Sequence, residues 1–210
     1  KKFSKDYQAG LFSFELEYLG EKVISNSGYF QDHKHQLNII SKSSATHSTL
    51  VLNNTSFIGF ERDKHGHMLV SKNFKILNKE IKLEKNFWFL KAAHDAYSKS
   101  FGVIHERQLS YLHEINKLEG CDTLIKTKNF NTTNFEIRFH LLPEINITKL
   151  LNNETILIES NNSGWKFTCK NYKIDIETGL YFGKKNRYSE NKNILIAGKT
   201  IPEEQKIFWD

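Results

Sequence analysis

The sequence predicts an all-β fold, a large antiparallel β-sandwich of about a dozen strands. Apolar residues recur at every second position along most of the chain, which is the pattern of half-buried strands. Segments rich in Gly, Asn and Ser separate these runs and supply the positive φ angles of tight turns. The 210 residues include only two prolines, and no convincing helical period is present. About a dozen strands are too many for one flat layer, so two packed sheets are expected.

The first strand and turn are predicted near the N-terminus. In Leu11–Tyr18 the apolar residues Phe12, Phe14 and Leu16 fall on one face and polar residues on the other, as in a strand with one buried face. Leu19–Lys22 then has the composition of a hairpin connection into the next strand.

Similar alternating runs recur along the rest of the chain, and each is expected to form a strand. They are Ser48–Leu52, Ile58–Glu61, Met68–Leu77, Phe87–Ala93, Phe101–Tyr111, Asp122–Lys126, Phe135–Leu141, Thr155–Glu159, Trp165–Cys169, Ile174–Leu180 and Asn193–Ala197. We expect further turns at Asp63–His67, Asn161–Gly164 and Ala197–Lys199, because these segments combine Gly with polar residues.

Length and composition indicate a single domain over residues 1–210. A chain of this length with 39% hydrophobic residues can bury most of its unfolded surface in one core. Thirty Lys and Arg against 24 Asp and Glu give a net charge of +6, which favours anionic partners. The excess is spread along the chain without a recognised motif, so nucleic acid is not an expected partner.

The chain shows no membrane or secretion segment of its own. No stretch reaches the roughly 18 consecutive apolar residues of a membrane helix, and Lys1–Gln8 lacks the apolar middle of a signal peptide. The only methionine is Met68, so we interpret the N-terminus as a boundary within a longer protein. Cys121 and Cys169 lie far apart and show no metal-site spacing; one disulfide and two buried thiols both stay open, and two free thiols are favoured.

Histidines at the edges of predicted strands are the main candidate site residues. His47, His94, His105 and His140 each border an apolar alternating run, so a rigid sheet could hold them while they face a surface. An imidazole can move a proton near neutral pH. A structural role, with the ring hydrogen-bonded inside the fold, is an equally open alternative for each.

Tyr97 and Arg107 extend this set. The predicted strands place imidazoles and a guanidinium on neighbouring strands, with Tyr97 between them. An Arg side chain can bind a carboxylate through two hydrogen bonds, as recognition of a carboxylated sugar requires. A buried ion-pair network between strands uses the same residue types and is equally open. Trp165 could stack on a sugar ring, although its sequence context is more typical of a core residue.

The other histidines lie in polar, loop-like segments and receive no role. His33 and His35 form one His-x-His pair, and His65 and His67 form another. Neither pair has a third ligand at a recognisable spacing. We therefore expect all four to be solvated.

Short motifs follow one another in a fixed order between Ala9 and Phe167. They are Ala9–Leu16, Asn26–Gly28, Ala45–Val51, His94–Tyr97, His105–Arg107, Phe139–Pro143 and Gly164–Phe167. Each motif is short, but the ordered set resembles the C-terminal β-domain of heparinase II/III-type polysaccharide lyases. The elements His47-Ser48-Thr49, His94-Asp95-Ala96-Tyr97 and His105-Glu106-Arg107 carry most of the resemblance.

The resemblance implies a two-part enzyme of the periplasm or cell envelope. An upstream α-helical toroid domain, absent from this sequence, and this β-domain would flank a cleft that holds an acidic polysaccharide. The implied reaction is β-elimination, in which a base removes the proton next to a uronic carboxylate. A tyrosine, normally from the helical part, protonates the leaving glycosidic oxygen, and polar or cationic groups stabilise the developing charge.

The candidate residues for such a polysaccharide cleft form two sets. The catalytic candidates are His47, His94, His105, Arg107 and His140. The substrate-binding candidates are Gln8, Asn26, Tyr97 and Trp165.

The sequence departs from the resembled pattern at two of these positions. The pattern implies a histidine just before the first Ser-Phe-Glu strand, an aspartate before the following Gly, and a histidine in the His-Ser-Thr element. Here these positions hold Gln8, Asn26 and His47. Amides do not titrate near neutrality and are weak zinc ligands, so we expect no metal and no cofactor. The sequence predicts the β-domain of a lyase with an altered site; the alternative is a non-catalytic carbohydrate-binding or structural β-sandwich.

Overall fold

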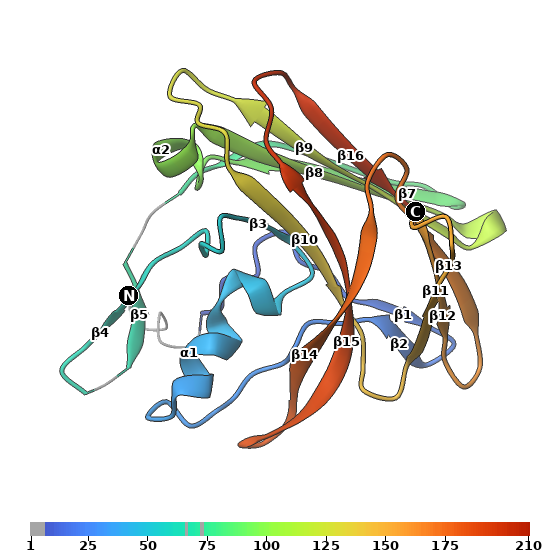
Figure 1. Cartoon of the computed structure of the whole chain (residues 1–210), viewed down its shortest axis with the longest axis horizontal. Helices are drawn as coiled ribbons and strands as arrows, with labels where there is room; N and C mark the ends of the chain where they lie inside the picture. The colour runs from blue at the N-terminus through green and yellow to red at the C-terminus, as the bar shows by residue number, and fades with distance from the viewer. Residues whose placement is uncertain (1–6, 66, 72–73) are drawn as a thin grey trace.

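The computed structural model of the chain describes residues 7–65, 67–71 and 74–210. Within these residues the chain forms antiparallel sheets with few helical turns (Figure 1), which confirms the predicted all-β class. No helix in this described part is long and apolar enough to cross a membrane.

Two sheets form most of the fold. The four-stranded sheet has the order β14 (Ile174–Lys184), β15 (Arg187–Lys199), β10 (Asn134–His140) and β3 (Leu50–Leu52). The five-stranded sheet has the order β16 (Gln205–Trp209), β9 (Lys117–Lys126), β8 (Val103–Leu112), β7 (Phe87–His94) and β6 (Ile76–Leu83). In Figure 1 the five-stranded sheet lies across the top and the four-stranded sheet runs below it.

Smaller elements complete the fold. The third sheet contains β11 (Asn146–Lys149), β12 (Thr155–Glu159) and β13 (Gly164–Thr168). Two hairpins are formed by β1 (Leu16–Tyr18) with β2 (Glu21–Ile24), and by β4 (Phe60–Arg62) with β5 (Met68–Val70). The helices are short: α1 (Gln36–Lys42), α2 (Ser98–Phe101) and the 3-10 turns Ser44–Thr46 and His113–Ile115.

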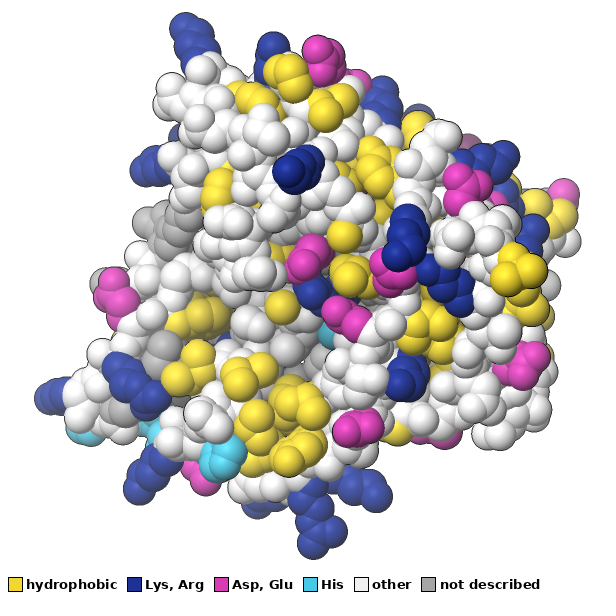
Figure 2. Space-filling view, viewed as in Figure 1, with side chains coloured by type: hydrophobic (Ala, Val, Ile, Leu, Met, Phe, Trp, Pro, Cys, Tyr) yellow, Lys and Arg dark blue, Asp and Glu magenta, His cyan; other side chains and the backbone are white. Residues whose placement is uncertain are grey.

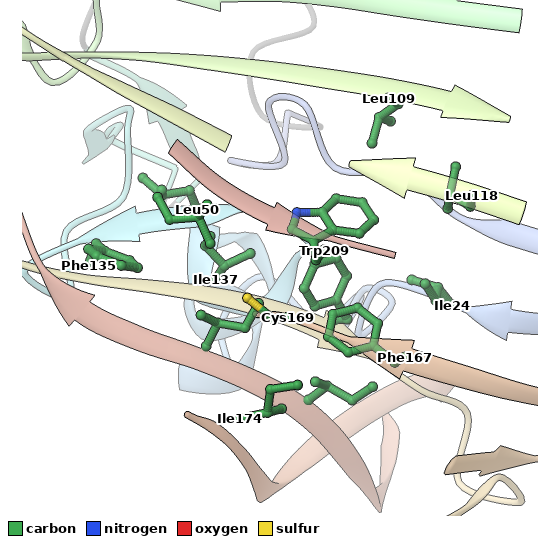
Figure 3. Close-up of a cluster of buried hydrophobic side chains, with 14 of the residues drawn as sticks. Ile24, Leu50, Leu109, Leu118, Phe135, Ile137, Phe167, Cys169, Ile174 and Trp209 are labelled. Carbon is green, nitrogen blue, oxygen red and sulfur yellow. The ribbon is translucent and has the colours of Figure 1, made fainter. Parts of the chain in front are cut away.

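The core lies where the sheets meet, and Trp209 of β16 occupies the junction (Figure 3). Its ring contacts Phe139 of β10 with ring centroids 4.7 Å apart and stacks on Phe14 at 5.7 Å. Phe167 of β13 adds a contact at 6.2 Å. One aromatic side chain therefore joins the three sheets, while its Nε1–H donates to Asp122 Oδ2 at 2.9 Å.

The first predicted strand is shorter than expected. Only Leu16–Tyr18 pairs as a strand, because Phe12 has a φ of 59° and cannot continue an extended chain. The backbone turns here, and the Ser13 N–H donates to the carbonyl of Gly10 at 3.0 Å. This turn aims the Phe12 carbonyl at Arg107 Nη1, 3.0 Å away, so a tertiary contact has replaced local strand pairing.

The predicted turns have mixed outcomes. The hairpin at Leu19–Lys22 is confirmed, since Leu19 and Gly20 both have positive φ and join β1 to β2. The turn at Asn161–Gly164 between β12 and β13 is confirmed as well. In Asp63–His67 one residue lies outside the described part of the chain; the segment joins β4 to β5.

A turn at Ala197–Lys199 is wrong, because β15 continues to Lys199. Gly198 pairs with Phe135 of β10, and a Cβ at Gly198 would lie 2.7 Å from that ring. The glycine therefore gives room to a core aromatic ring within a strand instead of marking a turn.

The strands β11 and β16 were not predicted, and β6, β9, β14 and β15 extend beyond their predicted runs. Asn146–Lys149 (β11) is mostly polar, and Gln205–Trp209 (β16) is short. The predicted run Met68–Leu77 contains two strands, β5 and the start of β6, with residues 72 and 73 outside the described part. β6 continues to Leu83 as an edge strand whose side chains are almost all exposed, so it shows no useful alternation.

We predict that Gly120→Ala destabilises the domain while Gly164→Ala does not. A Cβ at Gly120 would overlap the Trp209 ring, which packing and its hydrogen bond to Asp122 prevent from moving aside. Overpacking of this kind costs about 1–3 kcal/mol. A Cβ at Gly164 meets nothing within 4 Å, so its effect should stay within about 0.5 kcal/mol. Urea unfolding of both variants measures the difference, and equal stabilities would contradict this account of the core.

Candidate functional site

Three of the candidate residues, His94, His105 and Arg107, belong to one buried polar network centred on Asp122. His94 is the last residue of β7. His105 and Arg107 are two residues apart in β8 and both lie on its inward side. His105 Nε2 lies 2.7 Å from Asp122 Oδ1, and Arg107 contacts both carboxylate oxygens through Nε at 2.8 Å and Nη2 at 2.9 Å. His105 and Asp122 are fully buried, and Arg107 is 3% exposed.

Hydrogen-bond directions fix the tautomers of the two histidines. The Ala96 backbone N–H donates to His94 Nδ1 at 3.3 Å, so the proton of a neutral His94 ring is on Nε2. Nε2–H then donates to His105 Nδ1 at 3.2 Å. His105 in turn donates its Nε2–H to Asp122, and the chain of donors ends at the carboxylate.

The pKa shifts of these groups indicate two neutral imidazole rings beside an ion pair. Burial lowers the pKa of His94 to about 2, and burial also lowers the pKa of His105. Burial alone would raise the pKa of Asp122, but the Arg107 charge and the donated hydrogen bonds outweigh it and hold that pKa below its usual range. The network is therefore an Arg107–Asp122 ion pair extended by two neutral rings.

His47 and Gln8 form a second group at a partly exposed position. His47 follows the 3-10 turn Ser44–Thr46 and is 5% exposed, whereas Gln8 is half-buried. The His47 Nδ1–H donates to the Ser43 carbonyl at 2.8 Å, and Nε2 lies 3.1 Å from the Gln8 side-chain oxygen. Burial lowers the pKa of His47, so the neutral ring accepts at Nε2 when the Gln8 amide is rotated to present its NH2 group.

His140 lies close to this group but faces inward. Its Nε2–H donates to the Ala45 carbonyl at 3.1 Å, and Nδ1 therefore accepts from the Ser27 hydroxyl at 3.0 Å. Burial lowers its pKa to about 3, with the nearby His47 as the next cause. His140 thus connects the end of β10 to the segment that carries His47.

Ser48 joins the two groups. Its carbonyl accepts from Arg107 Nη1 at 2.7 Å, and its backbone N–H donates to Asn26 Oδ1 at 2.9 Å. Its hydroxyl accepts from the His140 backbone N–H at 2.9 Å. The candidate residues are therefore brought together through one serine, although most of their ring atoms are enclosed.

Of the remaining candidates, Tyr97 packs against His94 with ring centroids 5.6 Å apart, whereas Trp165 lies in a separate groove. Tyr97 is 1% exposed, and its hydroxyl is 3.3 Å from the carbonyls of Leu50 and Thr55. Trp165 is half-buried and donates Nε1–H to Ser163 Oγ at 3.0 Å. It lines a groove of about 520 Å³ together with Tyr18, with which it makes an edge-to-face contact.

Of the four histidines without an assigned role, His35 and His65 are exposed and His33 and His67 are half-buried. Each of them contacts another residue. His35 Nδ1 accepts from the Leu37 backbone N–H at the start of α1. His67 Nδ1 lies 3.3 Å from Asp63 Oδ2, and its ring contacts His33 with centroids 4.8 Å apart. In the described part of the chain, no group of three or more His, Cys, Asp or Glu side chains is placed to hold a metal ion.

Comparison with known families decides the membership of the chain. The family model described as heparinase II/III-like, C-terminal, matches residues 1–210. The chain belongs to the heparinase II/III-like family. No curated protein sequence gave a match.

Solved structures share the fold of this heparinase II/III-like domain. The heparan sulfate lyase HepC from Pedobacter heparinus superposes with a TM-score of 0.76 at 16% sequence identity, covering 96% of this chain and 30% of that one. A heparinase III gene product superposes with a TM-score of 0.73 at 15% identity, covering 96% of this chain and 29% of that one. The chain thus spans less than a third of the length of these lyases.

The metal position that the family resemblance implies does not fit a metal in this heparinase II/III-like domain. Gln8 and Asn26 are amides, and the Asn26 oxygen is already used by the Ser48 N–H. Only His47 of the three positions offers a good zinc ligand. Hydrogen bonds hold the three positions together where metal coordination would otherwise do so.

Sequence reasoning missed Asp122, Ser48 and Trp209 as parts of the network. The sequence predicts a strand that begins at Asp122, but only the strand register, which pairs Asp122 with Arg107, identifies its charge partner. An acidic residue in an otherwise apolar run was the available signal. Ser48 joins the network through its backbone carbonyl, which accepts from Arg107, and Trp209 joins it through its indole N–H, which donates to Asp122. No sequence pattern predicts either contact.

We predict that the heparinase II/III-like domain loses stability as pH falls below about 6.5, the unfolded histidine pKa. His140 and His94 have folded pKa values of about 3 and about 2. Between those values and 6.5 only the unfolded state binds the protons, so unfolding becomes more favourable by about 1.4 kcal/mol per pH unit for each such histidine. Urea unfolding at pH 7.5, 6.0 and 5.0 measures the slope.

The matched variants for this experiment are His94→Gln and His113→Gln. His113 is exposed and lies outside the buried network, so its replacement controls for the histidine-to-glutamine change itself. His94→Gln should lower the slope by about 1.4 kcal/mol per pH unit. An unchanged slope in His94→Gln would contradict the neutral assignment of that ring.

We predict that zinc does not stabilise the natural domain but stabilises the double variant Gln8→His, Asn26→Asp. The two substitutions supply an imidazole and a carboxylate next to His47, which completes a three-ligand set. Zinc at 100 times its Kd should add about 2.7 kcal/mol. Thermal unfolding with zinc or with a chelator checks this, with each single variant as control. Equal stabilisation of the natural domain would show that the amides do hold the metal.

Proposed function

We propose that this chain is the β-domain of a polysaccharide lyase that cleaves an acidic, uronate-containing glycan by β-elimination. The carrying observation is the family match over residues 1–210, together with a shared fold over 96% of the chain in proteins described as heparan sulfate lyases. An acidic polysaccharide is the proposed substrate, and an upstream helical domain of the same protein is the proposed partner. The proposed location is the periplasm or cell envelope.

The proposed cleft lies over the rim formed by Gln8 and Asn26. These two amides are half-buried, whereas His47 and His140 below them are buried. Glu15 and Lys22 border the rim: Asn26 Nδ2 lies 3.4 Å from Glu15 Oε1, and Lys22 Nζ lies 2.6 Å from Glu15 Oε2. The rim therefore offers amide donors and acceptors to a ligand, on a rigid support.

The proposed reaction assigns different roles to the rim and to the residues below it. A base takes the proton next to the uronic carboxylate, a carbon–carbon double bond forms, and the glycosidic oxygen leaves with a proton from an acid. Gln8 and Asn26 are the proposed donors to the substrate, because amide N–H groups stabilise developing oxyanion charge. His47, His140, His94, His105 and Arg107 are proposed as positioning residues, since their polar atoms bond within the protein.

A non-catalytic glycan-binding domain is the second candidate. It is favoured by the absence of titratable side chains at Gln8 and Asn26, and by the low pKa values of the buried histidines. Such groups can bind sugar hydroxyls but supply no exposed base. Product formation separates the two candidates.

The complete protein that carries this chain should release products with an ultraviolet-absorbing unsaturated end from at least one uronate glycan in a broad panel. Gln8→Ala should lower kcat/KM by about 10- to 100-fold through loss of a hydrogen bond made in the transition state. His113→Ala, at an exposed turn after β8, is the matched control and should not change kcat/KM. Saturable retention of glycans without any product would overturn the lyase proposal and leave the binding candidate.

A further inference from the structure

A second groove lies at the junction of α1 with the β14–β15 hairpin. It has a volume of about 680 Å³ and is lined by residues of both segments: Phe30, His35, Gln36, Leu180, Arg187 and Tyr188. In Figure 2 hydrophobic side chains gather at the lower centre of the molecule, with Lys and Arg side chains below them and a histidine to the left. None of the catalytic or substrate-binding candidates predicted from the sequence lines this groove.

Positive charge is concentrated at the tip of the hairpin. Lys184, Lys185 and Arg187 are all exposed and fall within four consecutive residues. No described carboxylate forms an ion pair with any of them. The groove lining contains no Asp or Glu, in contrast to the groove at Trp165, which Asp210 also lines.

The groove also carries an aromatic surface and directed donors. Tyr188 is 59% exposed, so a ring face is available for stacking on a sugar. His35 Nδ1 already accepts from the Leu37 N–H, which leaves its Nε2–H free to donate outward. Gln36 adds an exposed amide group.

The two walls of the groove are tied together. The Asp32 N–H donates to Asn186 Oδ1 at 2.9 Å, and the Phe182 N–H donates to the Ser27 carbonyl. Phe30 contacts both Phe182 and His35 through its ring. The backbone segments that carry the binding groups are therefore held next to each other before any ligand arrives, which reduces the entropy cost of binding.

We propose that this groove is a binding site for an anionic saccharide carrying sulfate or carboxylate groups, separate from the Gln8 and Asn26 rim. Arg187 and the two lysines attract and pair with the anionic groups, Tyr188 stacks on a sugar ring, and His35 and Gln36 bond hydroxyl or sulfate oxygens. One exposed ring does not provide the successive stacking surfaces that single-stranded nucleic acid requires. The choice of a glycan over other polyanions rests on the proposed function.

The acidic residues nearest in sequence to the groove are Asp32 and Glu190. Asp32 Oδ1 accepts from the Lys34 N–H, and Glu190 is exposed two residues after Tyr188, on the same side of β15. Glu190 should therefore repel an anionic ligand. Glu190→Gln is expected to strengthen binding.

The test measures the Kd of a sulfated, uronate-containing tetrasaccharide from heparin for the full chain by calorimetry. Arg187→Ala and Tyr188→Ala should each weaken binding by about tenfold, whereas Tyr188→Phe keeps the ring and should stay within about twofold. Lys173→Ala is the matched control, because Lys173 is an exposed cation paired with Asp175 near the opposite end of β14. Thermal unfolding of each variant verifies that the fold is retained.

Each outcome decides one proposal. Equal Kd values for the natural chain, Arg187→Ala and Tyr188→Ala would overturn the site, as would equally tight binding of a neutral tetrasaccharide or of a short oligothymidylate. Binding that depends on Arg187 in a protein that yields no unsaturated product would sink the lyase proposal and support this site. If the complete protein cleaves the glycan but binding does not depend on Arg187, the lyase proposal is supported and the groove is not a binding site.

Discussion

The carboxylate of Asp122 is the group on which the arrangement of the site depends. It accepts four hydrogen bonds, from His105, twice from Arg107 and from Trp209. Two carboxylate oxygens can accept about four, so the group is fully satisfied and stays ionised in the core. The donors come from β8 and β16, which flank β9, so one side chain fixes three adjacent strands. Removing one partner of such a buried pair costs about 3–5 kcal/mol.

The same ion pair extends from the core to the candidate site. Arg107 uses its remaining Nη1 donors on the carbonyls of Phe12 and Ser48, both in irregular segments before β3. Ser48 then positions Asn26 and the backbone of His140. The position of the half-buried rim is therefore set by a charge pair buried in the core, so a variant at Asp122 should affect stability and the position of the rim together.

The sequence predicts the all-β fold class but not the contacts between residues that are far apart in the chain. Alternation identified strands with one buried face, such as β10, but missed most of β6, whose side chains face water on both sides. The Phe12 turn was hidden because its φ of 59° is stabilised by Arg107, far away in sequence. The expectation that the candidate histidines face a surface is wrong, because His94, His105 and His140 are buried. Their burial, and hence their neutral state, depends on packing that spacing does not encode.

Neutral, buried histidines change how this domain can attract an anionic ligand. Because burial keeps the pKa of His47, His94, His105 and His140 below the usual range, none of these rings carries positive charge near pH 7. The positive charge of Arg107 is neutralised by its buried ion pair with Asp122. Electrostatic attraction must then come from exposed cations such as those of the β14–β15 tip, because Lys22, which borders the rim, is paired with Glu15. If both proposed sites bind an anionic saccharide, added salt should weaken binding at the β14–β15 tip more than binding at the rim.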